Sequence, residues 1–274
     1  MNKFAFITMD VESFFDTGCI RRHHIEPDER YDCAEKIKDF LVYLNKNNIK
    51  ATLFVTVDFI HRCKDYLVTA IEHGHEIALH ALHHKKVSEM SLEEFEESLK
   101  QAKEIIKKEL GVEIKGNRFP HFKKTDKHIE ILKNNGFLFD SGKFINKKHD
   151  YKKINDLVYE KDGFYEFALV KTRYCLFPIN ASGGGFLRLI PWHTMKRKVK
   201  KHLKKSDGYL LYLHPFEIYE GKLPKYKKLN PLERMFVQLF RDTYMNKIDT
   251  IVSLLKQENF QFVTMSEYIE KYGR

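Results

Sequence analysis

The sequence predicts an α/β protein built on a (β/α) barrel. Short apolar runs of strand length alternate along the chain with stretches of helical period, which is typical of parallel βα units. The chain has 274 residues and contains no internal repeat and no Pro-, Gly- or Ser-rich linker. A single domain over residues 1–274 fits this length better than two small folds.

The predicted strands are runs rich in apolar and β-branched residues, such as ATLFVTV and YLLYL. Each run is too short for a typical helix, and polar or turn-forming residues follow it. In chain order the strands cover residues 4–9, 51–57, 76–79, 137–139, 209–213 and 260–263, with a further short strand before Arg118.

The predicted helices carry apolar residues three or four positions apart and cover residues 34–44, 91–110, 127–134 and 243–256. The clearest is 91–110, where Ser91 and Glu94 form a capping box and Gly111 ends the pattern. Over about 143–191 we expect an aromatic, loop-rich insertion.

The composition excludes several classes of protein. Apolar residues make up 43% of the chain, which is typical of a folded protein and not of a disordered one. The four cysteines are scattered without a CxxC pair, which argues against a disulfide framework or a cysteine zinc site. The N-terminus has no signal-peptide pattern, and no run of about 18 apolar residues occurs. We therefore expect a cytoplasmic protein.

The net charge is +10, and its densest patch is Lys196–Lys205. This segment is interpreted first as a solvated basic helix, because runs of charge usually face water. The near-helical spacing of Trp192, Met195, Val199 and Leu203 also allows peripheral contact with the anionic inner face of a membrane. No recognisable nucleic-acid module accompanies the patch, so nucleic acid is not an expected partner.

Five polar residues each follow a predicted strand, namely Asp10, His80, Arg118, Asp140 and His214. In a parallel α/β barrel the carboxyl ends of the strands meet on one face, where such enzymes house their chemistry. One histidine at a strand end would be a weak signal, but five polar groups at five strand ends predict a functional site.

The pair His80 and His84 is a candidate metal site. Four residues apart on a helical turn, the two imidazoles would lie on one side, while His83 would point elsewhere. Imidazole favours Zn, Co, Ni or Fe over Mg or Ca. A carboxylate would complete the ligand set, and the nearest ones are Asp10 and Glu12 at the end of the first strand.

The motifs TMDVES, HALHH, NRFPHF and LHPFE occur in this order and resemble those of the polysaccharide deacetylase family, carbohydrate esterase family 4. The first motif has a D-V-E form, which a subset of that family carries. The segment Gly163–Glu217 is similar to a branch linked to exopolysaccharide export and surface-glycan assembly. The resemblance implies a distorted (β/α) barrel of the NodB-homology type and a metal-dependent hydrolase.

The resemblance also implies roles for the residues of the first three motifs. Asp10 would be the general base, held by Arg118. Glu12 would bind one divalent metal together with His80 and His84. Zinc is the first choice, with cobalt, nickel, manganese and iron as alternatives.

The later motifs would complete the catalytic machinery. The amide of His121, which follows Pro120, would help to bind the oxyanion. His214 would protonate the leaving amine, and Asp140 maps loosely onto the residue that orients this histidine.

These assignments predict an enzyme that removes an N-acetyl group from an amino sugar in a polysaccharide or a lipid-linked glycan precursor. Tyr165 and Trp192 would stack on sugar faces or form a hydrophobic cover. Two alternatives remain, a non-catalytic glycan-binding protein on the same fold and a metal-independent amidase of the same superfamily. The sequence does not predict the oligomeric state.

Overall fold

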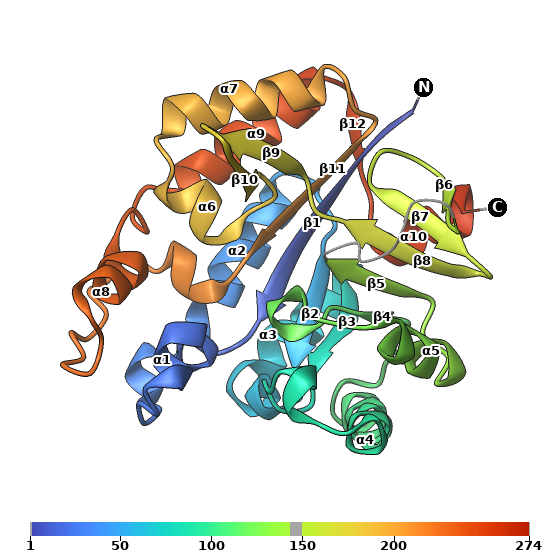
Figure 1. The fold of residues 1–274 in the computed structure, drawn as a ribbon, viewed down its shortest axis with the longest axis horizontal. Coiled ribbons are helices and arrows are strands. Elements are labelled where there is room, and N and C mark those ends of the chain that lie inside the picture. Colours follow the sequence, from blue (N-terminus) through green and yellow to red (C-terminus); the bar gives the residue numbers. More distant parts are fainter. Residues whose placement is uncertain (1, 143–149, 274) are drawn as a thin grey trace.

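The computed structural model describes residues 2–142 and 150–273, and most of its strands form one curled sheet (Figure 1). The strand order is β11-β1-β2-β3-β4-β5-β8-β7-β6, and β12 pairs with the first part of β1. Neighbours from β11 to β8 are parallel, whereas β7 and β6 run antiparallel. Within the described residues this ladder does not close into a ring, so the barrel is distorted, as predicted.

The strands are bounded as follows: β1 Lys3–Val11, β2 Thr52–Thr56, β3 Glu76–Ala81, β4 Gly116–Asn117, β5 Phe139–Gly142, β6 Lys152–Lys153, β7 Val158–Lys161, β8 Phe164–Ala168, β9 Lys171–Tyr174, β10 Phe177–Asn180, β11 Gly208–Leu213 and β12 Phe260–Phe262. The central strand β1 is buried along almost its whole length, because FAFITM carries apolar side chains on both faces.

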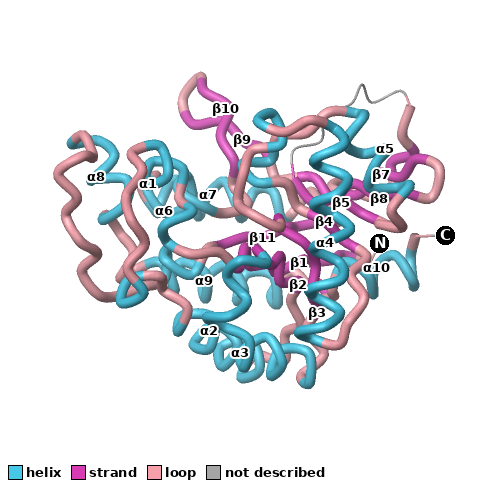
Figure 2. The backbone as a smooth tube through the Cα atoms, turned by 90° about the horizontal axis from the view of Figure 1, so that it is seen from below, coloured by secondary structure: helices cyan, strands magenta, loops and turns pink. Residues whose placement is uncertain are grey.

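The α-helices are α1 Gly18–Arg22, α2 Glu35–Lys46, α3 Ile60–Glu72, α4 Leu92–Leu110, α5 Asp126–Asn134, α6 Gly184–Leu189, α7 Trp192–Leu203, α8 Pro231–Gln238, α9 Tyr244–Gln257 and α10 Met265–Tyr272. They lie around the outside of the sheet, with α2 and α3 side by side (Figure 2). In α4 the predicted capping box is present, and Gly111 ends the helix in the left-handed conformation with φ 72°.

Over its described part, the segment expected to be a loop-rich insertion contains five short strands, β6 to β10, among its loops. Strands β7 and β8 form a hairpin that extends the sheet, and β9 and β10 form a second hairpin. In the first hairpin Asp162 and Gly163 both have positive φ, which suits the tight turn that joins two twisted strands. The Asp-Gly dipeptide in KDGF was the signal that could have predicted this hairpin.

The basic helix α7 packs its apolar side chains inward. Met195, Val199 and Leu203 are fully buried in the main core, where the helix lies against α9. Trp192 is partly buried against the same core, and its ring faces the ammonium of Lys247. The apolar face proposed for membrane contact is therefore occupied inside the protein. Among the described helices, none combines the length and the apolar character that crossing a bilayer requires.

A second, smaller core lies beside the main one, and we call it the side core. It consists of Phe14, Phe15, Ile20, Cys33, Phe216, Leu223, Leu229 and Val237. These residues tie α1 and α8 to the segment that follows β11. The side core thereby fixes one wall of the space beyond the strand ends.

Candidate active site and metal centre

The carboxyl ends of β1, β3 and β11 border a common cavity of about 290 Å³. Five polar residues predicted for the site line it, namely Asp10, Glu12, His80, His84 and His214. His121 lines the cavity as well.

Glu12 lies between the two histidines. Its Oε2 atom is 3.1 Å from Nε2 of His80 and 2.8 Å from Nε2 of His84, and all three side chains are buried. The expected helical turn is absent, because His80 lies in β3 and the chain bends after Ala81. His83 points away and pairs with Asp58 at 2.8 Å.

The donor set fits a divalent cation. Nδ1 of His80 lies 2.8 Å from the carbonyl of Arg118, which can only accept, so this nitrogen carries the proton and Nε2 is left as a ligand atom. Ligand atoms of Glu12, His80 and His84 all lie within 4.8 Å of one another. Burial alone would raise the pKa of Glu12, but the neighbouring imidazoles hold it well below its usual range. An ionised carboxylate with two imidazole nitrogens suits zinc or a similar ion.

A tight turn at the end of β1 aims two carboxylates into the cavity. The amide of Glu12 donates a hydrogen bond of 3.1 Å to the carbonyl of Asp10, two residues earlier. Asp10 and Glu12 lie two residues apart, on either side of Val11, and both side chains line the same cavity.

Arg118 holds Asp10 in place. Nη1 of Arg118 lies 2.6 Å from Oδ1 of Asp10 and 2.9 Å from the hydroxyl of Thr8, and Nη2 lies 2.7 Å from the hydroxyl of Ser141. The guanidinium is fully buried, and its Cζ lies 4.0 Å from the ring centroid of Phe54. The other oxygen of Asp10 faces Nε2 of His214 at 3.6 Å.

His214 is oriented by Glu217, a residue that the sequence analysis did not single out. Oε2 of Glu217 lies 2.9 Å from Nδ1 of His214 and accepts from its backbone amide at 3.2 Å. Burial lowers the pKa of His214, but the Glu217 hydrogen bond and the charges of Glu12, Glu217 and Asp10 raise it to about 9. The H-P-F-E spacing, a capping box around a short turn, was the available signal.

Asp140 does not contact His214, so its expected orienting role is wrong. It lies in β5 opposite Asn117 of β4, whereas His214 follows β11 across the sheet. The buried Asp140 carboxylate accepts from Asn117 at 3.0 Å and pairs with the ammonium of Lys124. Its neighbour Ser141 is the residue that reaches the site, through Arg118.

The two predicted sugar-stacking aromatics also lie elsewhere. Tyr165 is buried in β8, with its hydroxyl donating to the carbonyl of Gly273, and Trp192 packs on the core beside α9. The reason is that both side chains cover apolar core surface. The aromatic residues that line the cavity are Phe119, Phe122, Tyr212, Phe216 and Phe236.

The turn after Pro120 presents a free donor. His121 and Phe122 have φ values of 57° and 56°, a left-handed conformation that costs about 1–3 kcal/mol per non-glycine residue. Among the described residues the amide of His121 has no hydrogen-bond acceptor. Its ring lies edge-on to His84, with centroids 5.5 Å apart.

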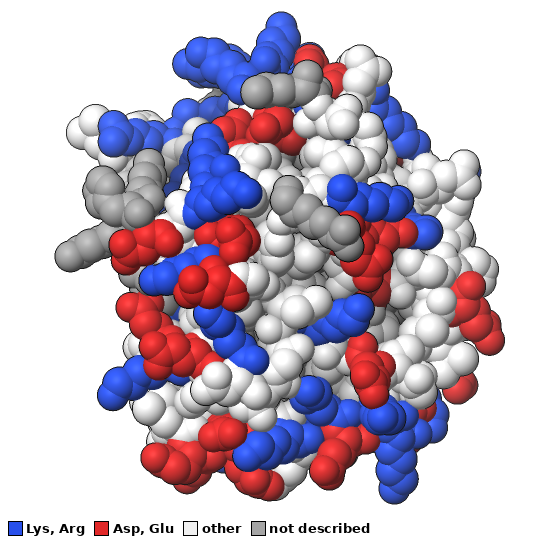
Figure 3. Space-filling model, turned by 90° about the vertical axis from the view of Figure 1, so that its right-hand side faces the viewer, with Lys and Arg blue, Asp and Glu red and all other residues white. Residues whose placement is uncertain are grey.

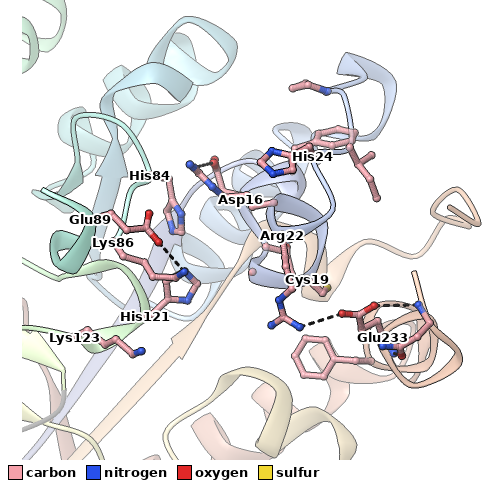
Figure 4. A pocket seen from close by; sticks show the side chains of 18 of the residues that line it. Asp16, Cys19, Arg22, His24, His84, Lys86, Glu89, His121, Lys123 and Glu233 are labelled. Carbon is pink, nitrogen blue, oxygen red and sulfur yellow. Dashed lines mark hydrogen bonds and ion pairs between the residues drawn. The ribbon is translucent and has the colours of Figure 1, made fainter. Parts of the chain in front are cut away.

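A groove of about 1140 Å³ adjoins the cavity and shares His84 and His121 with it (Figure 4). Residues of α1 and α8 form much of its wall. Two of its cations, Arg22 and Lys86, pair with Glu233 and Glu89, so the groove is polar but not strongly charged (Figure 4). The sequence analysis did not predict this groove.

Comparison with known proteins identifies related families and folds. Residues 13–139 match the family model described as polysaccharide deacetylase, and residues 146–270 match a domain of unknown function, DUF3473. Asp10 and Glu12 lie just before the first match, and His214 lies in the second. A search of curated proteins finds no match.

Solved structures share the fold. A Mycobacterium smegmatis protein described as a polysaccharide deacetylase is 15% identical, with 100% of this chain and 91% of that chain covered and a TM-score of 0.65. Peptidoglycan deacetylase PdaC from Bacillus subtilis is 16% identical, with 98% of this chain and 91% of that chain covered and a TM-score of 0.53. A CE4 family pseudoenzyme from Bacillus anthracis is 12% identical, with 97% of this chain and 65% of that chain covered and a TM-score of 0.56.

Proposed function

Because the chain belongs to the polysaccharide deacetylase family, we propose that it is a metal-dependent N-deacetylase. Its substrate would be an N-acetylated amino sugar in a polysaccharide or a lipid-linked glycan precursor. The observation that carries this proposal is the grouping of Glu12, His80 and His84 beside a carboxylate and a histidine in one cavity.

Glu12, His80 and His84 would hold one divalent metal, with zinc as the first choice. When bound, such an ion supplies Lewis acidity, which polarises a carbonyl and lowers the pKa of water to about 7. The carbonyl of Arg118 fixes the ring orientation of His80, and this keeps the ligand nitrogen aimed at Glu12.

Asp10 would act as the general base. The guanidinium of Arg118 occupies one oxygen of this carboxylate and leaves the other facing the cavity. The free oxygen would accept a proton from the attacking water.

His214 would deliver a proton to the leaving nitrogen. Glu217 accepts at Nδ1 and holds Nε2 toward Asp10 and the cavity. An amine is a poor leaving group unless it is protonated, so a positioned acid is needed on this side of the substrate. The free amide of His121 would stabilise the oxyanion that forms when water attacks.

A non-catalytic glycan-binding role is the second candidate. The Bacillus anthracis pseudoenzyme favours it, since that protein shares this fold. The presence here of a base, an acid and three metal ligands favours catalysis instead. Retention of metal without release of acetate from any N-acetylated sugar would support the binding role.

The test combines elemental analysis of the purified protein with release of free amine from N-acetylated oligosaccharides and lipid-linked sugars. We expect about one equivalent of metal per chain, because one ligand set occurs among the described residues, and loss of activity on chelation that returns with added zinc. A metal-free protein with full activity would point to the metal-independent amidases and would overturn the proposal.

A further inference from the structure

The hairpin formed by β9 and β10 carries the most exposed large apolar side chains in the described part of the chain. Leu176 is 90% exposed and Phe177 is 74% exposed, and the two are neighbours at the tip. Cys175 makes the turn with φ 52°, and Phe177 pairs back onto Tyr174. The hairpin projects from the body of the protein (Figure 2). Side chains this exposed cover little apolar surface in the described part of the chain.

The charge of the hairpin has one sign. Over residues 171–180 (KTRYCLFPIN) the charged residues are Lys171 and Arg173, and no acidic residue occurs. Neither cation has an ion-pair partner among the described residues. On the face shown in Figure 3, by contrast, acidic and basic side chains are mixed. An apolar tip above unpaired cations suits an anionic lipid surface, which offers an apolar interior beneath a negative layer.

The size of the tip argues against a protein partner. A stable protein interface buries about 800 Å² on each side. Two side chains at the end of a two-stranded ribbon provide much less area than that. Insertion into a bilayer requires only that the side chains reach its apolar layer, and Leu and Phe are favourable in its interface and core.

The hairpin is tied to the rim of the metal cavity. The side-chain amide of Asn180 donates to the hydroxyl of Tyr212, and the amide of Tyr212 donates to the carbonyl of Ser182. At Gly183 the backbone approaches so closely that a Cβ would collide with the carbonyl of Tyr212. Tyr212 and Gly184 in turn line the cavity.

We propose that Leu176 and Phe177 insert into the surface of an anionic lipid bilayer. This contact would hold the rim of the cavity that contains Glu12, His80 and His84 close to the membrane. The membrane contact stands on the hairpin alone. Its consequence, that the substrate is a glycan carried by the membrane, rests on the proposed deacetylase function.

Vesicle flotation tests the contact. Vesicles of phosphatidylcholine mixed with phosphatidylglycerol should bind the wild type, whereas phosphatidylcholine alone should bind it weakly. The double variant Leu176→Ser/Phe177→Ser should bind the mixed vesicles at least about tenfold more weakly, because two large apolar side chains are lost from the interface. Lys171→Gln/Arg173→Gln should weaken binding to mixed vesicles only, and added salt should do the same.

Val42→Ser is the matched control. Val42 is 61% exposed on α2, so it removes an exposed apolar side chain without touching the hairpin, and vesicle binding should not change. A direct probe is Phe177→Trp in a Trp192→Phe background, since Trp192 is the single tryptophan of the chain. Its fluorescence should shift to the blue with mixed vesicles and should be quenched by brominated lipid.

Wild-type protein that fails to float, or a double variant that floats equally well, would overturn the proposal. Concentration-dependent dimers that the double variant abolishes, without vesicle binding, would assign the tip to a second copy of the chain instead. On a soluble N-acetylated oligosaccharide, wild type and double variant should have equal activity. Absence of that activity with vesicle binding intact would reject the deacetylase function and leave the membrane contact standing.

Discussion

Replacing Glu217 with glutamine tests the proton-donor side of the site. The substitution keeps the shape of the side chain but removes the charge that faces Nδ1 of His214 at 2.9 Å. Both groups lie against the cavity, and Glu217 is almost fully buried, so water screens the interaction little. A hydrogen bond to a charged group in such a place contributes about 2–3 kcal/mol, which corresponds to a fall in kcat of roughly 30- to 150-fold.

The assay measures kcat and KM for amine release together with metal content and melting temperature. We expect Glu217→Gln to lower kcat with little change in KM, because Glu217 orients the proton donor His214 and does not position Glu12, His80 or His84. Metal content should stay at the wild-type value. Glu220→Gln, which removes an exposed carboxylate three residues further on, is the matched control and should behave as wild type. A Glu217→Gln enzyme with full kcat, or one that loses activity only by losing its metal, would refute the positioning role.

Further predictions concern the metal, the base, the core and pH. His84→Ala should lose both metal and activity, whereas His83→Ala, the adjacent histidine that faces Asp58, should retain both; equal metal loss in the two variants would contradict the ligand assignment. Asp10→Asn should lower kcat by about 10²- to 10⁴-fold with metal still bound, as measured by amine release and elemental analysis. Met195→Ala should lower the free energy of unfolding by about 2–5 kcal/mol, because its side chain is fully buried, whereas exposed Lys200→Ala should change it by less than about 0.5 kcal/mol in denaturant titration. His75, whose Nδ1 accepts from the amide of Ala51, has a pKa that burial lowers from 6.5 to about 4. As the pH falls, the unfolded chain therefore binds a proton at this histidine at a higher pH than the folded chain does. The free energy of unfolding should therefore fall by about 2 kcal/mol between pH 6.5 and pH 4, and His75→Gln should flatten that dependence; an unchanged slope would show that another group causes it.

The parts of the fold that follow from local pattern could be predicted. Helix α4 follows from its capping box and its terminal glycine, and β2 and β11 follow from runs of apolar and β-branched residues. The hairpins after residue 150 are hard to predict because their strands are only four or five residues long and all except the buried β8 are partly exposed, so no clear alternation of apolar and polar residues marks them. Only the Asp-Gly turn marked one of them.

The site was predictable where the motif residues themselves make the contacts. Glu12, His80 and His84 converge because the ends of β1 and β3 lie at the same edge of the sheet, and that follows from parallel topology. The partner of His214 could not be assigned by motif position, because Asp140 lies on the wrong strand and Glu217 reaches the histidine through a local turn. Likewise Tyr165 and Trp192 were chosen as aromatic residues, but sequence alone does not show which aromatic side chains face the core.

The pairing of β1 has a consequence for how the chain is made. This strand carries Asp10 and Glu12 at its end, yet its partners β11 and β12 begin only at Gly208 and Phe260. While the ribosome synthesises the intervening segment, one side of a nine-residue apolar strand stays without its hydrogen-bond partner. Fragments that stop before residue 208 would therefore be prone to aggregate, and the nascent protein depends on its last quarter to protect its first strand.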